Sequence, residues 1–309
     1  MYNILIDDIE SKKEQFKEVH GASGFYGGSD VAAICGLSPF ETPLGVWMRK
    51  TGKAPPVEEN EYMRFGTMME EIQRPLLATR LKMPVTPVNQ TWQSVEHTWM
   101  IASPDAITGG EQEGISLVEF KTHKAYADRY WGPDTASDSA MCQLQWYLAV
   151  SGFGGGYCCA LIGGDVDKFY YPYFESDKEV QSQLIERVDR FRDLVRSDTP
   201  PEVSADDAKD IVSLIRETSP AEINDLTSTH TKLMEEYKRW LDKRDAIKPT
   251  VDECELNLKR IKNQFLADSH GAGTILVGKD SVKLTHIPGK EYTTKREPYY
   301  RINIKIAGE

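Results

Sequence analysis

The chain has 309 residues, of which 40% are hydrophobic and 28% charged, a composition typical of a soluble globular protein and unlike that of a disordered or fibrous one. It has no apolar run long enough for a transmembrane helix, and its charged N-terminus lacks the apolar segment of a signal peptide, so we expect a cytoplasmic protein without membrane contact. The formal net charge of −11 argues against broad binding to nucleic acid, although an acidic shell around a narrow basic channel would give the same total.

The cysteines are expected to be free thiols in a reducing compartment. An odd number of cysteines without paired spacing argues against a disulfide framework and against a four-cysteine iron–sulfur cluster. The five are Cys35, Cys142, Cys158, Cys159 and Cys254.

The first part of the chain is expected to be helical. Apolar spacing predicts helices over residues 7–20, 31–35, 42–50 and 61–81. Ser29 or Asp30 is expected to cap the second of these helices. Backbone N–H groups at that helix start, together with the Ser29 hydroxyl, suit a phosphate group, although a plain capped helix explains the same residues equally well.

Two strand pairs follow. Residues 88–102 predict a pair of strands that turns around 94–97. The next pair is expected to have one strand ending at Asp105, a Gly-rich turn over 108–114, and a second, apolar strand over 115–121.

The second strand of this hairpin ends with charged residues. Side chains alternate along a strand, so Glu119 and Lys121 share one face while Phe120 points into the core. Asp105 can reach Glu119 across the hairpin, and two carboxylates suit Mg²⁺ or Mn²⁺, which activates a bound water and neutralises charge on a phosphodiester. Lys121 would orient that water or balance charge. A surface hairpin with a cross-strand ion pair is the alternative for the bare motif.

Residues 122–200 add further candidates. The polar, aromatic segment 122–139 contains Lys124 and Arg129 and suits nucleic-acid contact, although a packed surface loop explains it equally well. A helix over 140–150 places Gln143 and Tyr147 on one face, and the amide in so apolar a helix needs a partner. A buried strand over 157–162, its hairpin mate over 168–174 and an amphipathic helix over 180–195 complete this part.

The C-terminal part is expected to be an accessory unit. A capping box at Ser219 predicts a helix to about residue 247, and Pro249 is expected to restart it through 266, which gives a helical hairpin. Three short strands, over 274–277, 281–287 and 299–306, would form a small sheet. A coiled-coil arm is the alternative, but the apolar repeat looks too irregular for a long one.

Five sequence blocks, in this order, resemble the phage-type recombination exonucleases, that is the YqaJ-like viral recombinase and bacteriophage lambda exonuclease family of the PD-(D/E)xK superfamily. The blocks begin at Gly27, Gly66, Ala102, Glu119 and Gln143. The resemblance covers about residues 20–200. It implies an α/β (α+β) restriction-endonuclease-like core with a central mixed sheet flanked by helices over 1–200, with the helical hairpin and small sheet over 201–309.

The resemblance also implies site residues. The catalytic residues would be Lys121, Glu119, Asp105 and Gln143. The metal ligands would be Asp105, Glu119, the Phe120 carbonyl and Glu70, with Glu71 as the substitute if the helix register differs. Ser29 and Ser103 look like parts of a 5′-phosphate pocket, and Tyr147, Lys124 and Arg129 like further DNA contacts. The implied cofactor is Mg²⁺, for which Mn²⁺ can substitute.

One position departs from the family pattern. The family carries an Arg where this chain has Ala22. Lys17, His20 or a basic residue from elsewhere in the chain would have to take its place, which puts the strength of 5′-phosphate selection in question.

The family implies a 5′–3′ exonuclease on linear double-stranded DNA that leaves 3′ tails for recombination by single-strand annealing, in a bacterial or phage-infected cell. The family also implies that the protein forms a ring-shaped homotrimer and that a single-strand annealing protein is its partner. Two alternatives stay open: a structure-selective endonuclease or nickase on the same core, and a catalytically silent protein that binds DNA ends.

Overall fold

The computed structural model describes residues 2–21, 24–54, 60–110, 114–207, 227–268, 274–277 and 280–283. The chain divides into two compact units, Met1–Glu217 and Thr218–Glu309. The sequence had suggested a division at residue 200, whereas residues 201–207 lie with the first unit and Asp207 is buried there.

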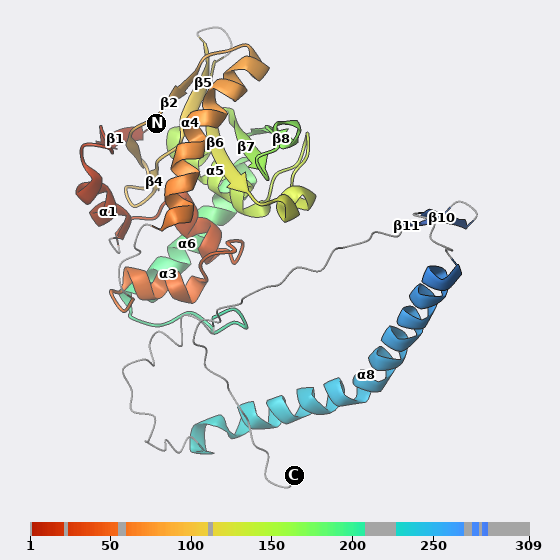
Figure 1. Ribbon diagram of the computed structural model, residues 1–309. Coiled ribbons are helices and arrows are strands. Elements are labelled where there is room, and N and C mark those ends of the chain that lie inside the picture. The colour runs from red at the N-terminus through yellow and green to blue at the C-terminus, as the bar shows by residue number, and fades with distance from the viewer. Residues whose placement is uncertain are drawn as a thin grey trace. The chain divides into compact units, whose positions relative to one another are not determined.

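A six-stranded mixed sheet forms the centre of the first unit (Figure 1). Its strand order is β2-β5-β6-β7-β8, with β9 paired to β7. The strands are β2 (Val85–Pro87), β5 (Ala106–Gly110), β6 (Gly114–His123), β7 (Gly155–Ile162), β8 (Phe169–Tyr170) and β9 (Tyr173–Glu175). The pair β6–β7 is parallel and the other pairs are antiparallel, so the predicted class, a central mixed sheet flanked by helices, is confirmed.

A second, three-stranded sheet lies on the same unit. It contains β1 (Tyr2–Ile6), β3 (Thr91–Ser94) and β4 (Ile101–Ala102). The pair β3–β4 is the strand pair predicted within 88–102. The sequence does not predict β1, whose five residues directly precede the helix expected over 7–20.

Helix α5 (Asp138–Ser151) packs on one face of the central sheet and α4 (Glu61–Leu81) on the other. The further described helices of this unit are α1 (Lys13–Gly21), α2 (Gly28–Ile34), α3 (Pro43–Lys50) and α6 (Lys178–Arg196), with short 3-10 turns η1 (Ala125–Tyr130) and η2 (Val166–Lys168). On one face, Leu117 and Cys158 pack into a core with Leu144 and Trp146 of α5. On the other face, Phe120 packs with Leu77 of α4. Strand alternation therefore turns Glu119 and Lys121 toward α5.

The hairpin before Lys121 differs from its prediction. Asp105 precedes β5 instead of ending a strand, and residues 108–110 extend β5 instead of forming a turn. Thr108 pairs with Ser116 of β6, and its hydroxyl donates to the Pro84 carbonyl at 2.8 Å. Gly109 adopts a φ of 114°, which glycine tolerates, so the ladder continues through residues whose composition is typical of turns.

The second unit contains one long helix, α8 (Thr227–Asp268), of 42 residues. The predicted helical hairpin is wrong, because the chain passes through Pro249 without leaving the helix. Figure 1 shows α8 bending along its length, as a proline inside a helix explains. A hairpin of β10 (Thr274–Val277) and β11 (Asp280–Lys283) follows. The predicted cap at Ser219 and strand over 299–306 lie outside the described residues. No described helix combines the length and apolar character needed to cross a membrane.

Candidate active site

Asp105 closes the end of the β5–β6 ladder. The strand pairing ends at Ala106 and Val118, and the next N–H on that side of β6, from Phe120, donates to Asp105 Oδ2 at 2.7 Å. Burial raises the pKa of Asp105 well above its ordinary value, and the nearby charges of Glu119 and Glu70 raise it further. Asp105 thus lies within electrostatic reach of two more carboxyl groups.

Glu119, Lys121 and Gln143 form a closed hydrogen-bonded triangle. Lys121 Nζ donates to Glu119 Oε1 at 2.7 Å and to Gln143 Oε1 at 2.9 Å, while Gln143 Nε2 donates to Glu119 Oε1 at 2.7 Å. Burial acts to lower the pKa of Lys121, but the Glu119 and Asp105 carboxylates raise it above its ordinary value, so the ammonium keeps its proton at neutral pH. The triangle fixes Lys121 and Gln143 against β6.

Tyr147 continues this network along α5. Gln143 Nε2 also lies 3.0 Å from Tyr147 Oη, one helical turn away. Burial raises the pKa of Tyr147 well above its ordinary value, as do the charges of Glu119 and Asp105, so the phenol stays neutral. A hydrogen bond between the Tyr147 hydroxyl and the backbone of Ser103 ties the network to the segment before Asp105.

Glu70 reaches the site from α4. It is half-buried, and burial together with the charge of Glu119 raises its pKa to about 7. Its neighbour Glu71 is exposed and pairs with Arg74 at 2.6 Å. Of these two glutamates, the structure brings Glu70 to the site, as the sequence had favoured.

The donor set fits a hydrated hard cation. Glu119 is 3% exposed, and its Oε2 is buried without a hydrogen-bond partner among the described residues. Nor does any group of three or more His, Cys, Asp and Glu side chains in the described part of the chain gather closely enough to enclose an ion. Mg²⁺ needs no such cage, because it keeps several waters and binds through one or two carboxylates.

The start of α2 packs against Gln143 and Tyr147. A Cβ atom on Gly28 would lie 2.5 Å from Gln143 Cγ and 2.8 Å from Tyr147 Cε1, so glycine alone permits this approach. Ser29 is exposed in the first turn of α2. Gly27, and not Ser29 or Asp30, occupies the N-cap position, but Asp30 takes part in the cap from the first turn by accepting a hydrogen bond from the Gly27 N–H at 3.1 Å. Glycines therefore occupy the N-cap and the first position of α2, where this helix packs closely against α5.

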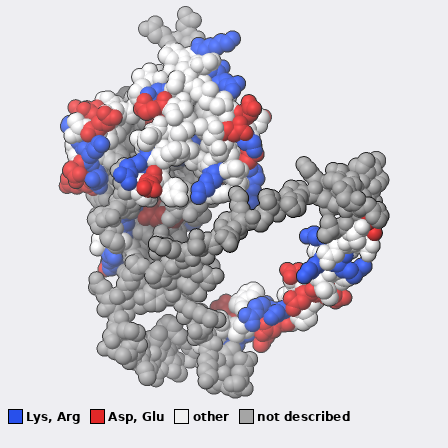
Figure 2. Space-filling view, viewed as in Figure 1, with Lys and Arg blue, Asp and Glu red and all other residues white. Residues whose placement is uncertain are grey.

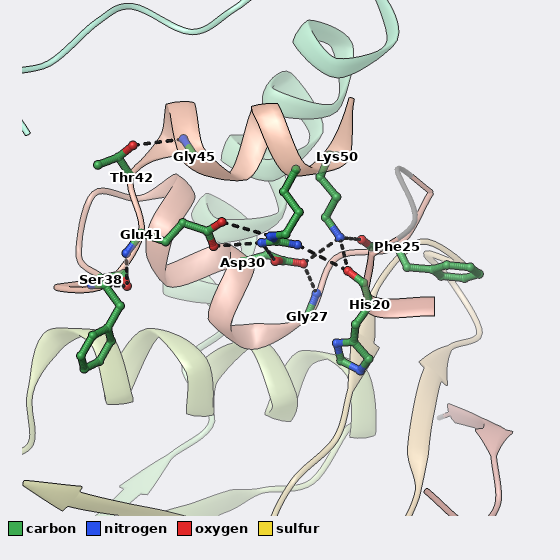
Figure 3. A network of polar contacts seen from close by, with 11 residues as sticks. His20, Phe25, Gly27, Asp30, Ser38, Glu41, Thr42, Gly45 and Lys50 are labelled. Atoms are coloured by element: carbon green, nitrogen blue, oxygen red, sulfur yellow. Dashed lines mark hydrogen bonds and ion pairs between the residues drawn. The ribbon is translucent and has the colours of Figure 1, made fainter. Parts of the chain in front are cut away.

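A buried ionic network supports this helix start (Figure 3). Asp30 Oδ1 pairs with Arg49 at 2.6 Å, and Asp30 Oδ2 pairs with Lys50 at 3.1 Å. Arg49 also pairs with Glu41 at 2.9 Å, and Lys50 Nζ donates to the carbonyls of His20 and Phe25. Burial acts to raise the pKa of Asp30, but the charges of Lys50 and Arg49 lower it below its ordinary value.

Two basic groups of α3, Arg49 and Lys50, therefore lie against the start of α2. Figure 3 shows the His20 imidazole pointing away from the network, and its Nε2 lies 3.4 Å from Ser103 Oγ. Lys17 instead pairs with Glu14 at 3.1 Å on an exposed face. The sequence had offered Lys17, His20 or a basic residue from elsewhere in the chain in place of the missing arginine. Arg49 and Lys50 carry no local signal in the sequence beyond their place at the end of a predicted helix.

Lys124 precedes η1, and Arg129 lies within it. Lys124 Nζ is 5.3 Å from the ring of Tyr62, and the Arg129 guanidinium is 4.7 Å from the ring of Tyr130. Both cations are exposed. The described contacts place them with aromatic rings, not in the triangle of Glu119, Lys121 and Gln143.

Comparison with known proteins relates part of this chain to a protein family. Residues 15–154 match the model of the YqaJ-like viral recombinase domain. The protein YqaJ of Bacillus subtilis (strain 168), itself uncharacterized, is 27% identical over 245 residues, which cover 77% of this chain and 73% of YqaJ. Crystal structures of the alkaline exonuclease LHK-Exo from Laribacter hongkongensis, one of them with dAMP, align at 17% identity with TM-scores of 0.49 and 0.48, over 60% of this chain and 93% of theirs.

The residues that match the family model include those of the candidate site. The matched range contains Asp105, Glu119, Lys121 and Gln143, which the structure brings together at one end of β6. Residues 15–154 of this chain are therefore similar to the YqaJ-like viral recombinase domain, and these four side chains lie within the matched range.

Proposed function

We propose that the protein is a metal-dependent deoxyribonuclease, and that Asp105, Glu119, Lys121 and Gln143 form its active site. The observation that carries this proposal is the buried Glu119 carboxylate. Its Oε1 is held by Lys121 and Gln143, whereas its Oε2 has no partner among the described residues. A buried carboxylate oxygen without a donor costs free energy unless a cation approaches it.

Mg²⁺, or Mn²⁺ in its place, would be held by Asp105, Glu119 and the Phe120 carbonyl, with Glu70 nearby. When bound, such an ion lowers the pKa of a water and neutralises charge on the attacked phosphodiester. Asp105 and Glu119 are preorganised for this role, because hydrogen bonds from Phe120 N–H, Lys121 and Gln143 fix one oxygen of each.

Lys121 and Gln143 would act on the substrate. The Lys121 ammonium keeps its proton, so it can donate to a phosphate oxygen or to the attacking water and balance the charge that develops. Gln143 holds Lys121 from the far side at 2.9 Å and is itself positioned by Tyr147. Burial of these groups strengthens each electrostatic interaction in the site.

The substrate would be the end of linear double-stranded DNA, cut from the 5′ end so that 3′ tails remain for annealing. The exposed Ser29 at the start of α2, with its free backbone N–H groups, is suited to a terminal phosphate. Ser103, in contact with His20 and Tyr147, lies between that helix start and Asp105. By analogy with the family, we also propose that the protein forms a homotrimer around the duplex and that a single-strand annealing protein is its partner.

The test uses linear duplex DNA with a 5′ phosphate and Mg²⁺. Wild-type protein is expected to release mononucleotides, and Asp105→Asn and Lys121→Met are expected to reduce the rate at least 100-fold, because each removes a charge at the reacting phosphate. Lys168→Met is the matched control, since Lys168 pairs with Asp128 at 2.6 Å away from the triangle. Chelation of the metal should abolish release by wild-type protein and by this control.

Other outcomes would change the assignment. Cleavage of closed circular DNA would identify an endonuclease or nickase on the same core. Duplex binding with no metal-dependent cleavage, or full activity in Lys121→Met, would contradict the proposed nuclease site.

A further inference from the structure

Helix α8 carries an apolar stripe whose repeat is regular from Leu233 to Phe265, so the expectation that the repeat is too irregular for a long coiled coil is wrong over this stretch. From Leu233 to Phe265, apolar residues recur at alternating steps of four and three positions, as in Leu233, Tyr237 and Trp240 at one end and Leu258, Ile261 and Phe265 at the other. Every position in this series except Arg244 is apolar. We call these positions the seam. A repeat that averages 3.5 residues keeps one face of a helix turned toward a partner helix along its whole length.

The seam is exposed to solvent. Trp240 is 57% exposed and Ile247 is 60% exposed. From residue 230 to 268, the described side chains of α8 are exposed except those of Leu241 and Phe265, which are half-buried. Within the part of the chain that the structure describes, no group buries the middle of this stripe.

A lone helix of this kind lacks sufficient stabilisation in water. Most helical stability in proteins comes from packing of an apolar face, which the described residues do not supply here. Pro249 inside α8 lowers the stability of the helix further, because it removes one backbone hydrogen bond. By the helical repeat, Pro249 lies on the face opposite the seam, so its ring does not interrupt packing along the seam.

We propose that α8 pairs along the seam with α8 of a second copy of this chain, in an antiparallel two-stranded coiled coil. The helix is about 63 Å long at 1.5 Å per residue, and a partner must offer the same repeat over a similar length. The next longest described helix, α4, has 21 residues, so another α8 is the match that the chain itself provides.

Arg244 determines the direction of the pair. In a parallel pair Arg244 would face its own copy within the seam, and like charges in that position are destabilising. In an antiparallel pair centred on Pro249, Arg244 faces Cys254 of the other copy, while Ile247 faces Val251. The antiparallel arrangement therefore removes a buried repulsion and keeps the central layers apolar.

Mass in solution tests the pairing and does not depend on the proposed nuclease activity. Wild-type protein is expected to be at least dimeric, and Ile247→Glu is expected to lower its mass at least twofold because it places a charge in the seam. Leu256→Glu is the matched control: Leu256 is 68% exposed on the same helix but lies outside the seam. A monomeric wild-type protein, an unchanged mass in Ile247→Glu, or an equal drop in both variants would overturn the proposal.

Cysteine crosslinking tests the direction. Under mild oxidation with copper–phenanthroline, the Arg244→Cys variant is expected to form crosslinked dimers through Cys254 of the other copy, whereas the wild-type protein is not. Adding Cys254→Ser to Arg244→Cys should abolish the crosslink. If the double variant still crosslinks, or if wild-type protein crosslinks through Cys254, the helices run parallel and the proposed direction is wrong.

Discussion

The charged residues of the site are defined by burial as much as by their neighbours. Asp105, Glu119 and Glu70 all have pKa values raised by burial, and the charge of Glu119 raises those of Asp105 and Glu70 further. Lys121 is the one group of the triangle whose positive charge offsets this repulsion. Removal of Lys121 should therefore affect the protonation of the carboxylates as well as the substrate.

His20 should make the protein sensitive to acid. Burial lowers its pKa from 6.5 to about 4, with smaller effects from the charges of Asp30, Lys50 and Arg49. Between these pH values the unfolded chain binds more protons than the folded one, so stability is complete above pH 6.5 and falls as the pH drops toward 4. At pH 5 this loss is about 2 kcal/mol.

Denaturant unfolding at pH 7 and pH 5 measures this effect. His20→Gln is expected to lose less stability between the two pH values than wild-type protein does. His97→Gln, in the turn between β3 and β4, is the control and should behave as wild type. Equal pH dependence in wild-type protein and His20→Gln would show that His20 is not buried in its neutral form.

Among single residues, the sequence predicted the polar side chains of the triangle but not the ionic network that packs behind α2. Strand alternation was sufficient to place Glu119 and Lys121 together, and helix spacing placed Gln143 beside Tyr147. Asp30, Arg49 and Lys50 could not be predicted as a network, because they meet only when α2 and α3 pack. Long-range ion pairs of this kind leave no local pattern in a sequence.

Among the elements, the contact between α2 and α5 determines how accurately Gln143 is placed. Gly28 allows the two helices to approach until its Cα lies against the side chains of Gln143 and Tyr147. The ionic network between Asp30 of α2 and the two basic residues of α3 holds α2 in this position. The helix start that we propose for a terminal phosphate is thus in direct contact with the glutamine of the triangle.

A methyl group at Gly28 should separate these helices or displace Gln143. Gly28→Ala is expected to reduce the cleavage rate at least tenfold, because a displacement of the order of 1 Å at a positioning group is costly to catalysis. Gly154→Ala is the control, since a Cβ there meets no atom within 4 Å. Cleavage assays with both variants, with their melting temperatures, make the comparison, and an unchanged rate in Gly28→Ala would contradict the role of this contact.

The helices and strands differ in how well their local sequence predicts their secondary structure. Helix α3 follows its local signals, with Pro43 in the first turn and Thr42 accepting from the Gly45 N–H at 3.1 Å. Strand β5 does not, because its glycines favour a turn and only pairing with β6 extends it. Helix α8 also departs from its local signal, since a proline at 249 predicts a break and the helix continues through it.

For the whole molecule, the net charge of −11 requires that any DNA contact be local. Figure 2 shows acidic and basic side chains interspersed over the visible face, without a broad basic patch. Lys124 and Arg129 are exposed near η1, and each lies beside an aromatic ring, an arrangement suited to a nucleic-acid backbone.

Duplex affinity should therefore depend on few cations. Lys124→Ala and Arg129→Ala are each expected to weaken binding for all sequences alike and to reduce the slope of log affinity against log salt by about 1. Arg190→Ala on α6, paired with Glu186 at 2.6 Å, is the control. Affinity measured at several salt concentrations gives the slopes. Slopes identical to that of wild-type protein would exclude Lys124 and Arg129 from phosphate contact.

The bond from the Phe120 N–H to Asp105 has a consequence for how inactive versions of this protein are built. In that bond a side chain substitutes for the missing strand and completes the last rung of the β5–β6 ladder. Replacing Asp105 by alanine would leave the buried Phe120 N–H without an acceptor, so the variant would lose activity and its sheet would be destabilised at the same time. Asparagine keeps the acceptor while discarding the charge, and it is the substitution that separates chemistry from architecture.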